Sequence, residues 1–504
     1  MNIKRAKQEI TDTIEAYLMQ DEDGEYVIPA VRQRPILLLG APGIGKTQIM
    51  EQIAKECSLA LVAYTITHHT RQSAIGLPFI SKKKFGDQEY QVTEYTMSEI
   101  IASMYQRMEE TGLSRGILFL DEINCVSETL APAMLQFLQY KTFGSHSIPK
   151  GWVIVAAGNP PEYNKSVREF DVVTMDRVKR IDVEPDFAVW KEYALKQQLH
   201  PAVLSYLTTH PGSFYRMETT VDGRSFATPR SWEDLSGLLQ VYEKLNKPVD
   251  KEVIVQYIQH DRTARDFANY LELYSKYRMD GELEAVLDGK ISDDLLRKAS
   301  RASFDERLNI VGILHARLSG CFMDALRSLE VLDLIYPVLL KLKEGLTGGG
   351  SQDAGTLMEE TLADFQEEAV RLRKADLLDR QKRKLYRKAA DLLQEGRSEA
   401  VRVPDGDGGK IFLAWKTWFD RCQDEAEEKN RTALERLEYA FDFLEAAYGG
   451  GQEMVLFVTN LNTDPHSIRF LQENACERYF RYNRELLFDE KTQEIEMRLK
   501  ELQV

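Results

Sequence analysis

The stretch Gly40-Ala41-Pro42-Gly43-Ile44-Gly45-Lys46-Thr47 decides how the rest of this chain is organised. It has the spacing G-x-x-x-x-G-K-[ST], follows the apolar run Ile36–Leu39 and precedes an amphipathic segment that begins near Gln48. This pattern predicts a strand, a glycine-rich turn and a helix, in which backbone N–H groups and the helix N-terminus bind phosphate. We expect Lys46 to reach the terminal phosphates and Thr47 to help hold Mg²⁺. The alternative is a glycine-rich turn that binds no ligand. That interpretation does not explain Lys46, because a cation in the first turn of a helix opposes the helix dipole.

The composition narrows the class of protein. A length of 504 residues predicts roughly three domains, and 43% apolar residues suffice for packed cores. The net charge of −15 argues against non-specific nucleic-acid binding, which depends on lysine and arginine. No apolar run approaches the ~20 residues that span a bilayer, the N-terminus lacks the apolar core of a signal peptide, and five scattered cysteines are typical of reduced thiols. We therefore expect a cytoplasmic protein without a membrane partner, and the charge argues against a nucleic-acid partner.

A second motif carries two adjacent carboxylates. The apolar run Gly116–Leu120 leads directly into Asp121 and Glu122. Asp121 is expected to support Mg²⁺ through water, and Glu122 to orient and deprotonate an attacking water. An isolated Asp-Glu pair after a strand is usually a solvated turn. After a phosphate-binding loop, in a parallel α/β pattern, the pair indicates nucleotide hydrolysis.

A third strand end carries an amide. The run Trp152–Ala157 predicts a strand that ends in Gly158, Asn159 and Pro160. Ligands bind at the carboxyl ends of strands in open α/β sheets, so Asn159 is expected to hold the nucleophilic water or the γ-phosphate. The alternative is a turn asparagine before a proline.

Two further segments place arginines near such a site. Arg177 and Arg180 follow a helix end and enter a fifth strand, where an arginine can reach the γ-phosphate of a neighbouring subunit. Thr228 and Pro229 have the residue types of an N-cap and a first helical position. Arg230 then lies in the first turn, where its charge is unfavourable unless an anion binds nearby. The alternative in each case is a solvated surface arginine.

These features, in this order, resemble an AAA+ ATPase. The sequence motifs are most similar to those of the MoxR type, in the helix-2-insert clade. They are Asp121-Glu122-Ile123-Asn124, Gly158-Asn159-Pro160 and Met175-Asp176-Arg177, and the resemblance covers about residues 28–280. A predicted β-hairpin over 79–95 and the segment Lys141 to Lys150 lie where that clade carries insertions. This chain departs from the family pattern with Cys125, where an arginine is common, and with Val178, where a phenylalanine is common.

The resemblance implies an α/β fold: a three-layer P-loop core with a parallel sheet, a helical lid, and ATP bound between the subunits of a ring, usually a hexamer. Glu122 would be the base, Asn159 the first sensor and Arg230 the second sensor. Either Arg177 or Arg180 would be the arginine finger. Thr47 and Asp121 would hold Mg²⁺, and the predicted ATP-binding residues are Gly40, Ala41, Pro42, Gly43, Ile44, Gly45, Lys46, Thr47 and Gln48.

The second half of the chain shows helical patterns and, after residue 280, no catalytic constellation. Residues 345–351 predict a flexible break, 356–395 a helical hairpin or coiled coil, and the apolar run 454–458 a strand. We predict four domains: a nucleotide-binding core with an N-terminal helix (1–190), a helical lid (191–280), a helical extension (281–345) and a mostly α-helical C-terminal interaction domain (352–504).

The leading functional hypothesis is a chaperone-like motor, a ring that hydrolyses ATP to remodel or mature a protein partner. MoxR-type ATPases commonly work with proteins that bear a von Willebrand factor A domain, so the resemblance implies such a client. One alternative is a slowly hydrolysing, nucleotide-switched scaffold. Another is a nucleic-acid-directed or GTP-using ring, against which the acidic charge argues.

Overall fold

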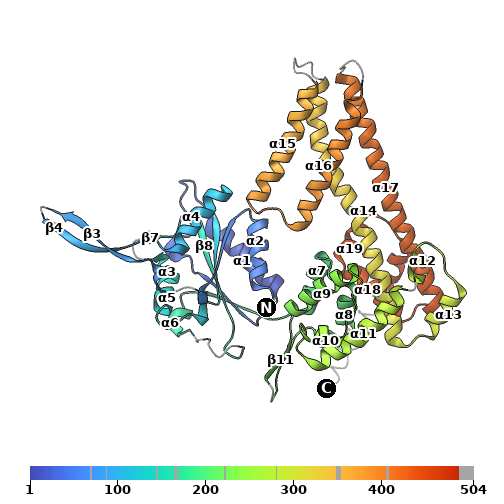
Figure 1. Ribbon diagram of the computed structural model, residues 1–504, viewed down its shortest axis with the longest axis horizontal. Helices are drawn as coiled ribbons and strands as arrows, with labels where there is room; N and C mark the ends of the chain where they lie inside the picture. The colour runs from blue at the N-terminus through green and yellow to red at the C-terminus, as the bar shows by residue number, and fades with distance from the viewer. Residues whose placement is uncertain are drawn as a thin grey trace. The chain divides into compact units, whose positions relative to one another are not determined.

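The computed structural model describes residues 1–68, 71–86, 88–143, 146–163, 167, 170–220, 223–279, 281–347, 354–403 and 408–486 (Figure 1). The chain separates into two compact units. The first comprises Met1–Val189 with Glu368–Arg383, and the second comprises Trp190–Glu367 with Lys384–Val504. Within the described ranges, every helix is too short or too polar to cross a bilayer.

A five-stranded parallel sheet forms the centre of the first unit and confirms the predicted α/β class. Its strands, in spatial order, are β2 (Ala60–Thr65), β5 (Gly116–Asp121), β8 (Trp152–Gly158), β1 (Ile36–Gly40) and β9 (Lys179–Val183). All neighbouring strands pair in parallel. Because the strands are parallel, the phosphate-binding loop and the residues that follow β5 and β8 emerge at the same edge of the sheet, and because β8 lies between β5 and β1, they emerge side by side.

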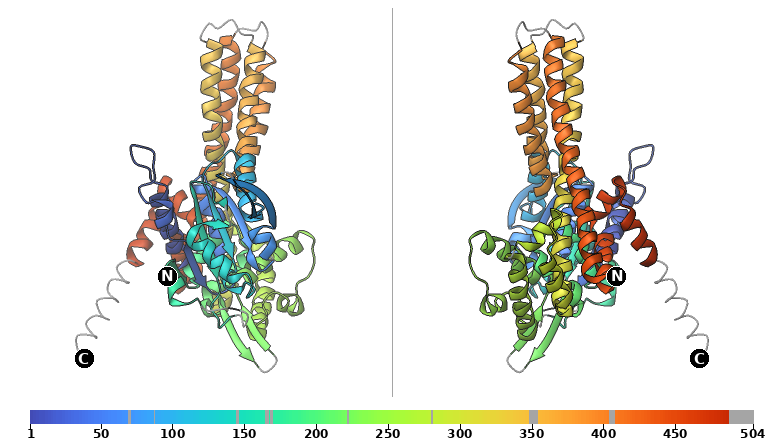
Figure 2. Two further views of the ribbon diagram at one scale, coloured as in Figure 1. Left: turned by 90° about the vertical axis from the view of Figure 1, so that its left-hand side faces the viewer. Right: turned by 90° about the vertical axis from the view of Figure 1, so that its right-hand side faces the viewer.

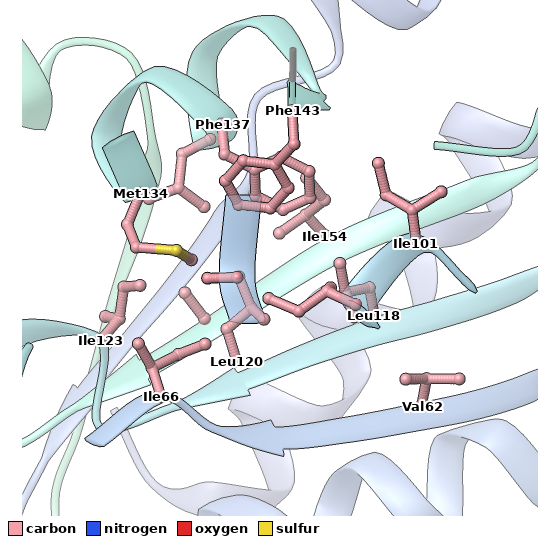
Figure 3. Packing of buried hydrophobic residues seen from close by; sticks show 14 of the residues in the cluster. Val62, Ile66, Ile101, Leu118, Leu120, Ile123, Met134, Phe137, Phe143 and Ile154 are labelled. Atoms are coloured by element: carbon pink, nitrogen blue, oxygen red, sulfur yellow. The ribbon is translucent and has the colours of Figure 1, made fainter. Parts of the chain in front are cut away.

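Helices cover both faces of this sheet. The three central strands β5, β8 and β1 are almost entirely buried, as in parallel sheets that carry helices on both faces. On one face α4 (Glu99–Thr111) and α5 (Ala131–Tyr140) pack against alternate strand residues. Figure 3 shows this cluster, in which the rings of Phe137 and Phe143 stack with centroids 4.0 Å apart. The other strand residues, which alternate in sequence with those that face α4 and α5, point to the opposite face of the sheet. This is the face on the side of α1 (Ile3–Leu18) and α2 (Lys46–Glu56).

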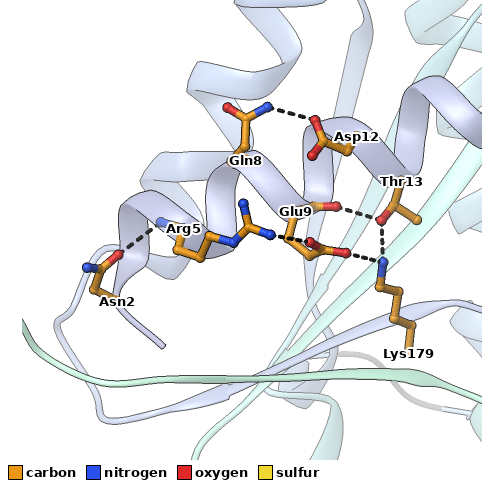
Figure 4. Close-up of polar contacts among 7 residues, drawn as sticks. All are labelled: Asn2, Arg5, Gln8, Glu9, Asp12, Thr13 and Lys179. Carbon is orange, nitrogen blue, oxygen red and sulfur yellow. Dashed lines mark hydrogen bonds and ion pairs between the residues drawn. The ribbon is translucent and has the colours of Figure 1, made fainter.

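A polar cluster fixes α1 on the edge strand β9 (Figure 4). Asn2 caps the helix, since its Oδ1 accepts a hydrogen bond of 2.9 Å from the backbone N–H of Arg5. The Lys179 ammonium donates to Glu9 Oε1 at 2.7 Å and to Thr13 Oγ1 at 2.6 Å. The hydrogen bond from Lys179 lowers the pKa of Glu9. Lys179 in β9 therefore anchors the N-terminal helix α1 to the sheet.

The hairpin predicted near 79–95 is confirmed. It consists of β3 (Pro78–Phe85) and β4 (Gln88–Tyr95), which pair with each other and with no third strand in the described ranges. The exposed lysines near its tip are partly neutralised by ion pairs of Lys82 with Glu89 and of Lys83 with Glu94. A second, short hairpin joins β6 (Thr142–Phe143) and β7 (His146–Ser147) within the predicted 141–150 segment.

Short helices and one hairpin build the first part of the second unit. A buried aromatic cluster of Tyr206, Trp232 and Phe267 joins three of the helices. The sequence pattern did not indicate the hairpin of β10 (Arg216–Thr220) and β11 (Gly223–Ala227). The helices are α7 (Phe187–Lys196), α8 (Pro201–Thr209), α9 (Pro229–Lys244), α10 (Lys251–Val255), α11 (Asp261–Met279), α12 (Glu282–Leu287) and α13 (Asp293–Arg301).

Long helices dominate the remainder and confirm a mostly α-helical C-terminal region. Figure 2 shows the long yellow and orange helices running side by side. At Gly396 an added Cβ would lie 2.5 Å from the Trp415 ring, so glycine permits the close approach of two helices. They are α14 (Phe304–Thr347), α15 (Ala354–Lys374), α16 (Arg380–Ala400), α17 (Gly408–Tyr448), α18 (Gln452–Thr463), α19 (Pro465–Glu473) and a final helix over 477–486.

Three local predictions need correction or restriction. The run 454–458 is not a strand but part of α18, whose buried residues Met454, Phe457, Val458 and Leu461 follow a helical spacing. The pattern Thr96-Met97-Ser98-Glu99 predicts a capping box with Thr96 as the N-cap, but Ser98 caps α4 and Thr96 Oγ1 accepts a hydrogen bond from the Leu77 N–H. Of the predicted break at 345–351, residues 345–347 end α14 and 348–351 lie outside the described residues, as does 487–504.

Lys141 gives the first unit a testable pH dependence. Its side chain is 7% exposed and donates to Gln33 Oε1 at 3.2 Å, and burial lowers its pKa to about 8 from 10.5. Below pH 8 the Lys141 amine is protonated in both the folded and the unfolded state. The free-energy cost of burying its charge then lowers the stability of the folded state by its full amount. Between pH 8 and 10.5 the unfolded state holds more protons, so the contribution of Lys141 to stability rises with pH.

We expect Lys141→Met to stabilise the fold by about 2 kcal/mol at pH 7. The gain should shrink as the pH rises from 8 towards 10. Thermal unfolding followed by circular dichroism at pH 7 and pH 9.5 measures both effects. The exposed Lys150→Met is the matched control, expected to change little at either pH. A gain that is constant across this pH range would contradict the assignment.

Candidate nucleotide-binding site

The turn between β1 and α2 has the conformation of a phosphate-binding loop. Gly43 and Gly45 have positive φ angles of 77° and 92°, which favour glycine. At Gly40 an added Cβ would lie 2.5 Å from the carbonyl oxygen of Val183, so only glycine fits beside β9. The three glycines of the motif therefore each meet a local backbone requirement, and α2 begins at Lys46, two residues before the predicted start near Gln48.

The Lys46 side chain is held at the mouth of the loop. It is 8% exposed, and its ammonium donates to the carbonyl oxygens of Gly40 at 2.7 Å and Ala41 at 2.9 Å. A third hydrogen bond of 2.9 Å goes to Asn159 Oδ1 at the end of β8. The structure thus brings the loop lysine and the predicted amide into direct contact, although they are distant in sequence.

The two carboxylates at the end of β5 lie beside the same loop. Thr47 Oγ1 donates to Asp121 Oδ2 at 3.1 Å. Glu122 adopts a left-handed conformation, with φ of 56°, and its backbone N–H donates to Asp121 Oδ1 at 2.9 Å. A non-glycine residue in this region is strained, and such strain is common at functional sites. Because of this turn the two adjacent carboxylates have different partners: Asp121 contacts Thr47, and Glu122 contacts Thr67.

Thr67 is a site residue that the sequence analysis missed. Its hydroxyl donates to Glu122 Oε2 at 2.9 Å. Thr67 lies just beyond β2, which pairs with β5 so that Thr65 stands opposite Asp121. A polar residue at the carboxyl end of a strand next to β5 is a candidate site residue, but Thr67 can be recognised as one only when the strand order is known. Thr67 holds the carboxylate of Glu122 in one orientation.

The residues present fit a nucleotide with Mg²⁺. The hydroxyl of Thr47 and the carboxylate of Asp121 are hard oxygen ligands within 3.1 Å of each other, which suits Mg²⁺. The positive-φ glycines turn backbone N–H groups of the loop towards a phosphate. Gln48, in the first turn of α2, places Oε1 over Gly45, 3.3 Å from where a Cβ would lie.

The candidate arginine fingers lie apart from this cluster. Asp171 caps the short helix α6 (Val172–Met175), and the hydrogen bonds from Thr174 lower the pKa of Asp171. Arg177 follows α6 and is exposed, whereas Arg180 lies in β9 and donates to Asp182 Oδ1 at 2.8 Å. Among the described residues neither guanidinium bonds to a member of the cluster.

Arg230 belongs to the second unit. It lies exposed in the first turn of α9. Thr228 caps this helix as predicted, since its Oγ1 accepts from the Ser231 N–H at 3.2 Å, and Pro229 is the first helical residue. The local structure therefore presents Arg230 at a helix N-terminus, and its nucleotide-sensing role stays a prediction.

One comparison with known proteins, a family model, supports the interpretation of the first unit as a nucleotide-binding domain. Residues 35–178 match the family model of the AAA domain, dynein-related subfamily. No curated protein matches the chain. Among solved structures, a lysine-to-arginine mutant of RuvB from Thermotoga maritima is 16% identical, over 60% of this chain and 75% of that chain, with a TM-score of 0.29. The matched domain spans β1 to the residues before β9 and thus contains the loop, Asp121, Glu122 and Asn159.

Proposed function

We propose that this chain, whose residues 35–178 form an AAA domain of the AAA+ ATPases, is a MoxR-type ATPase that hydrolyses ATP between the subunits of a cytoplasmic ring to remodel or mature a protein partner. The observation that carries the proposal is the convergence of three strand ends. Lys46 bonds to Asn159, and Thr47 bonds to Asp121. The phosphate-binding loop is thereby joined to the ends of β8 and β5, as an ATP-hydrolysing site requires.

Each residue has a role in the proposed reaction. The loop N–H groups and Lys46 bind the phosphates, while Glu122, oriented by Thr67, accepts a proton from the attacking water. As the water oxygen bonds to the γ-phosphorus, the bond to the β–γ bridging oxygen breaks and ADP leaves. Mg²⁺, held by Thr47 and Asp121, would neutralise charge on the phosphates. Asn159 is placed to hold the water or the γ-phosphate.

We assign the arginine finger to Arg177 in preference to Arg180. The Arg180 guanidinium is already engaged by Asp182 in its own strand. Arg177 is exposed and forms no ion pair within 4.0 Å in the described ranges, although its charge helps to lower the pKa of the nearby Asp171, so its guanidinium is available to a neighbouring subunit. Arg230 would sense the nucleotide from the lid over 191–280. The extension over 281–345 and the helices of 352–504 would contact the client, for which a von Willebrand factor A domain protein is our proposal.

Mixing two inactive variants tests the shared site. Glu122→Gln and Arg177→Ala should each abolish most ATP turnover, because one removes the base and the other the finger. In mixed hexamers some interfaces combine a wild-type Glu122 with a wild-type Arg177, so we expect mixing to restore turnover to roughly a tenth or more of wild type. Phosphate release, measured with oligomer size by light scattering, gives the result.

The controls separate the possible outcomes. Arg180→Ala should retain turnover in its own right. Mixed variants that form rings but stay inactive would exclude a site shared between subunits. Full turnover by a strictly monomeric wild type would exclude it as well. A wild type that binds ATP and hydrolyses no faster than Glu122→Gln would favour a nucleotide-switched scaffold.

A further inference from the structure

Asn124 joins the two strand ends that carry the candidate site. It lies in the short helical turn Ile123–Cys125, directly after Glu122, and is 4% exposed. Its Nδ2 donates to the backbone carbonyl oxygen of Asn159 at 2.8 Å. The side-chain Oδ1 of Asn159 in turn accepts from Lys46 at 2.9 Å. Asn159 is therefore held at its backbone by Asn124 and at its side chain by the loop lysine.

The residue before Asn159 is shaped to receive this amide. A Cβ at Gly158 would lie 2.6 Å from Asn124 Oδ1 and 2.8 Å from Asn124 Cγ. Side-chain Cβ atoms do not approach other atoms this closely, so Asn124 occupies space that only glycine leaves open. The side chain of Asn124 is thus fixed by packing as well as by its hydrogen bond.

This arrangement costs stability. Asn124 Oδ1 is buried and has no hydrogen-bond partner in the part of the chain that the structure describes. A buried acceptor without a partner costs about 1–3 kcal/mol, and an apolar residue of similar size would avoid that cost. An apolar residue would also leave the Asn159 carbonyl without its donor, so the amide at this position is explained by its hydrogen bond to Asn159.

We propose that Asn124 is a positioning residue that fixes Asn159 relative to Lys46 and Glu122 in the nucleotide site. The inference rests on the proposed ATPase function for its kinetic consequence, but its structural part stands independently. Without the hydrogen bond to its carbonyl, the Asn159 segment moves relative to the loop. A displacement of about 1 Å at a catalytic group lowers a rate on the order of 100-fold.

Three variants separate positioning from packing. Asn124→Ala removes the hydrogen bond, and we expect a fall in kcat of about 10- to 100-fold with the ATP dissociation constant changed less than about threefold. Gly158→Ala forces the Asn124 side chain out and should also lower the unfolding temperature. The double variant makes room for the new methyl group. It should therefore recover the unfolding temperature relative to Gly158→Ala while kcat stays at the level of Asn124→Ala.

Hydrogen exchange provides a readout that does not require turnover. The backbone amides of residues 156–159, 162 and 163 should exchange at least about tenfold faster in Asn124→Ala than in the wild type, because their anchor is lost. Asn309→Ala is the matched control, since Asn309 is a buried asparagine of the second unit. It should leave the exchange of 156–163 and kcat unchanged.

The outcomes are distinguishable. An unchanged kcat and unchanged exchange in Asn124→Ala would overturn the inference. Recovery of full turnover in the double variant would also overturn it, since packing alone would then explain the effect. If the wild type hydrolyses no ATP, the proposed function fails, and the exchange rates of 156–163 still decide the role of Asn124.

Discussion

Replacing Glu122 by glutamine is expected to lower ATP turnover by about 10²- to 10⁴-fold, the range typical for loss of a general base. The change is nearly isosteric, and a glutamine carbonyl can still accept the hydrogen bond that Thr67 donates to Glu122 Oε2 at 2.9 Å. The strained turn at Glu122 should therefore persist. Nucleotide binding, which depends on Lys46 and the loop, should remain close to that of the wild type.

Phosphate release at saturating ATP, together with titration by a fluorescent ATP analogue, measures both quantities. Glu109→Gln is a matched control, because Glu109 is an exposed glutamate on α4, away from the loop and strand ends of the site. It should keep wild-type turnover. Equal turnover in Glu122→Gln and wild type, with ATP bound in both, would remove the assignment of the base.

Replacing Trp232 by alanine should cost about 3–5 kcal/mol of stability in the second unit. The ring is fully buried and meets Tyr206 and Phe267 with centroids 5.7 and 5.3 Å away. Its Nε1 donates to the carbonyl oxygen of Ser213 at 3.1 Å. Truncation leaves a large cavity where three helices meet, and it leaves that carbonyl without its donor.

Trp232→Phe separates the two contributions. It keeps most of the ring volume but loses the donor, so about 1–2 kcal/mol should be lost. Urea unfolding followed by far-ultraviolet circular dichroism measures both variants. A cost below about 1 kcal/mol for Trp232→Ala would show that α9 is not anchored by this cluster. Because Arg230 stands two residues before Trp232, the alanine variant should also weaken any sensing of nucleotide by that arginine.

Local patterns were sufficient for much of the candidate site. Strand ends and phosphate-binding loops have signatures that are only a few residues long. Such signatures identify the glycine spacing at 40–47, the carboxylates after 116–120 and the amide after 152–157. Thr67 and Asn124 have no such signature. A threonine after a strand and an asparagine in a turn gain a role only through partners far away in the chain.

Short apolar runs show the same limit in the second half. Residues 454–458 are rich in β-branched and aromatic side chains and suggest a strand, yet they lie in α18. Over five residues, a buried strand and a buried helix have similar hydrophobic patterns, and the surrounding helices decide between them. The longer periodic segment over 356–395 was predicted as a helical hairpin or coiled coil, and it is helical in α15 and α16, because several turns of helix average out such ambiguity.

The sequence by itself determined where the strands of the parallel sheet, the phosphate-binding loop and its carboxylates lie, because backbone conformation and apolar periodicity act between near neighbours. Only the tertiary structure decided that β8 stands between β1 and β5. Strand order depends on how crossover connections pack helices on both faces of the sheet, which no local pattern records. That order brings Lys46, Asp121 and Asn159 to one edge and gives Asn124 the carbonyl that it binds.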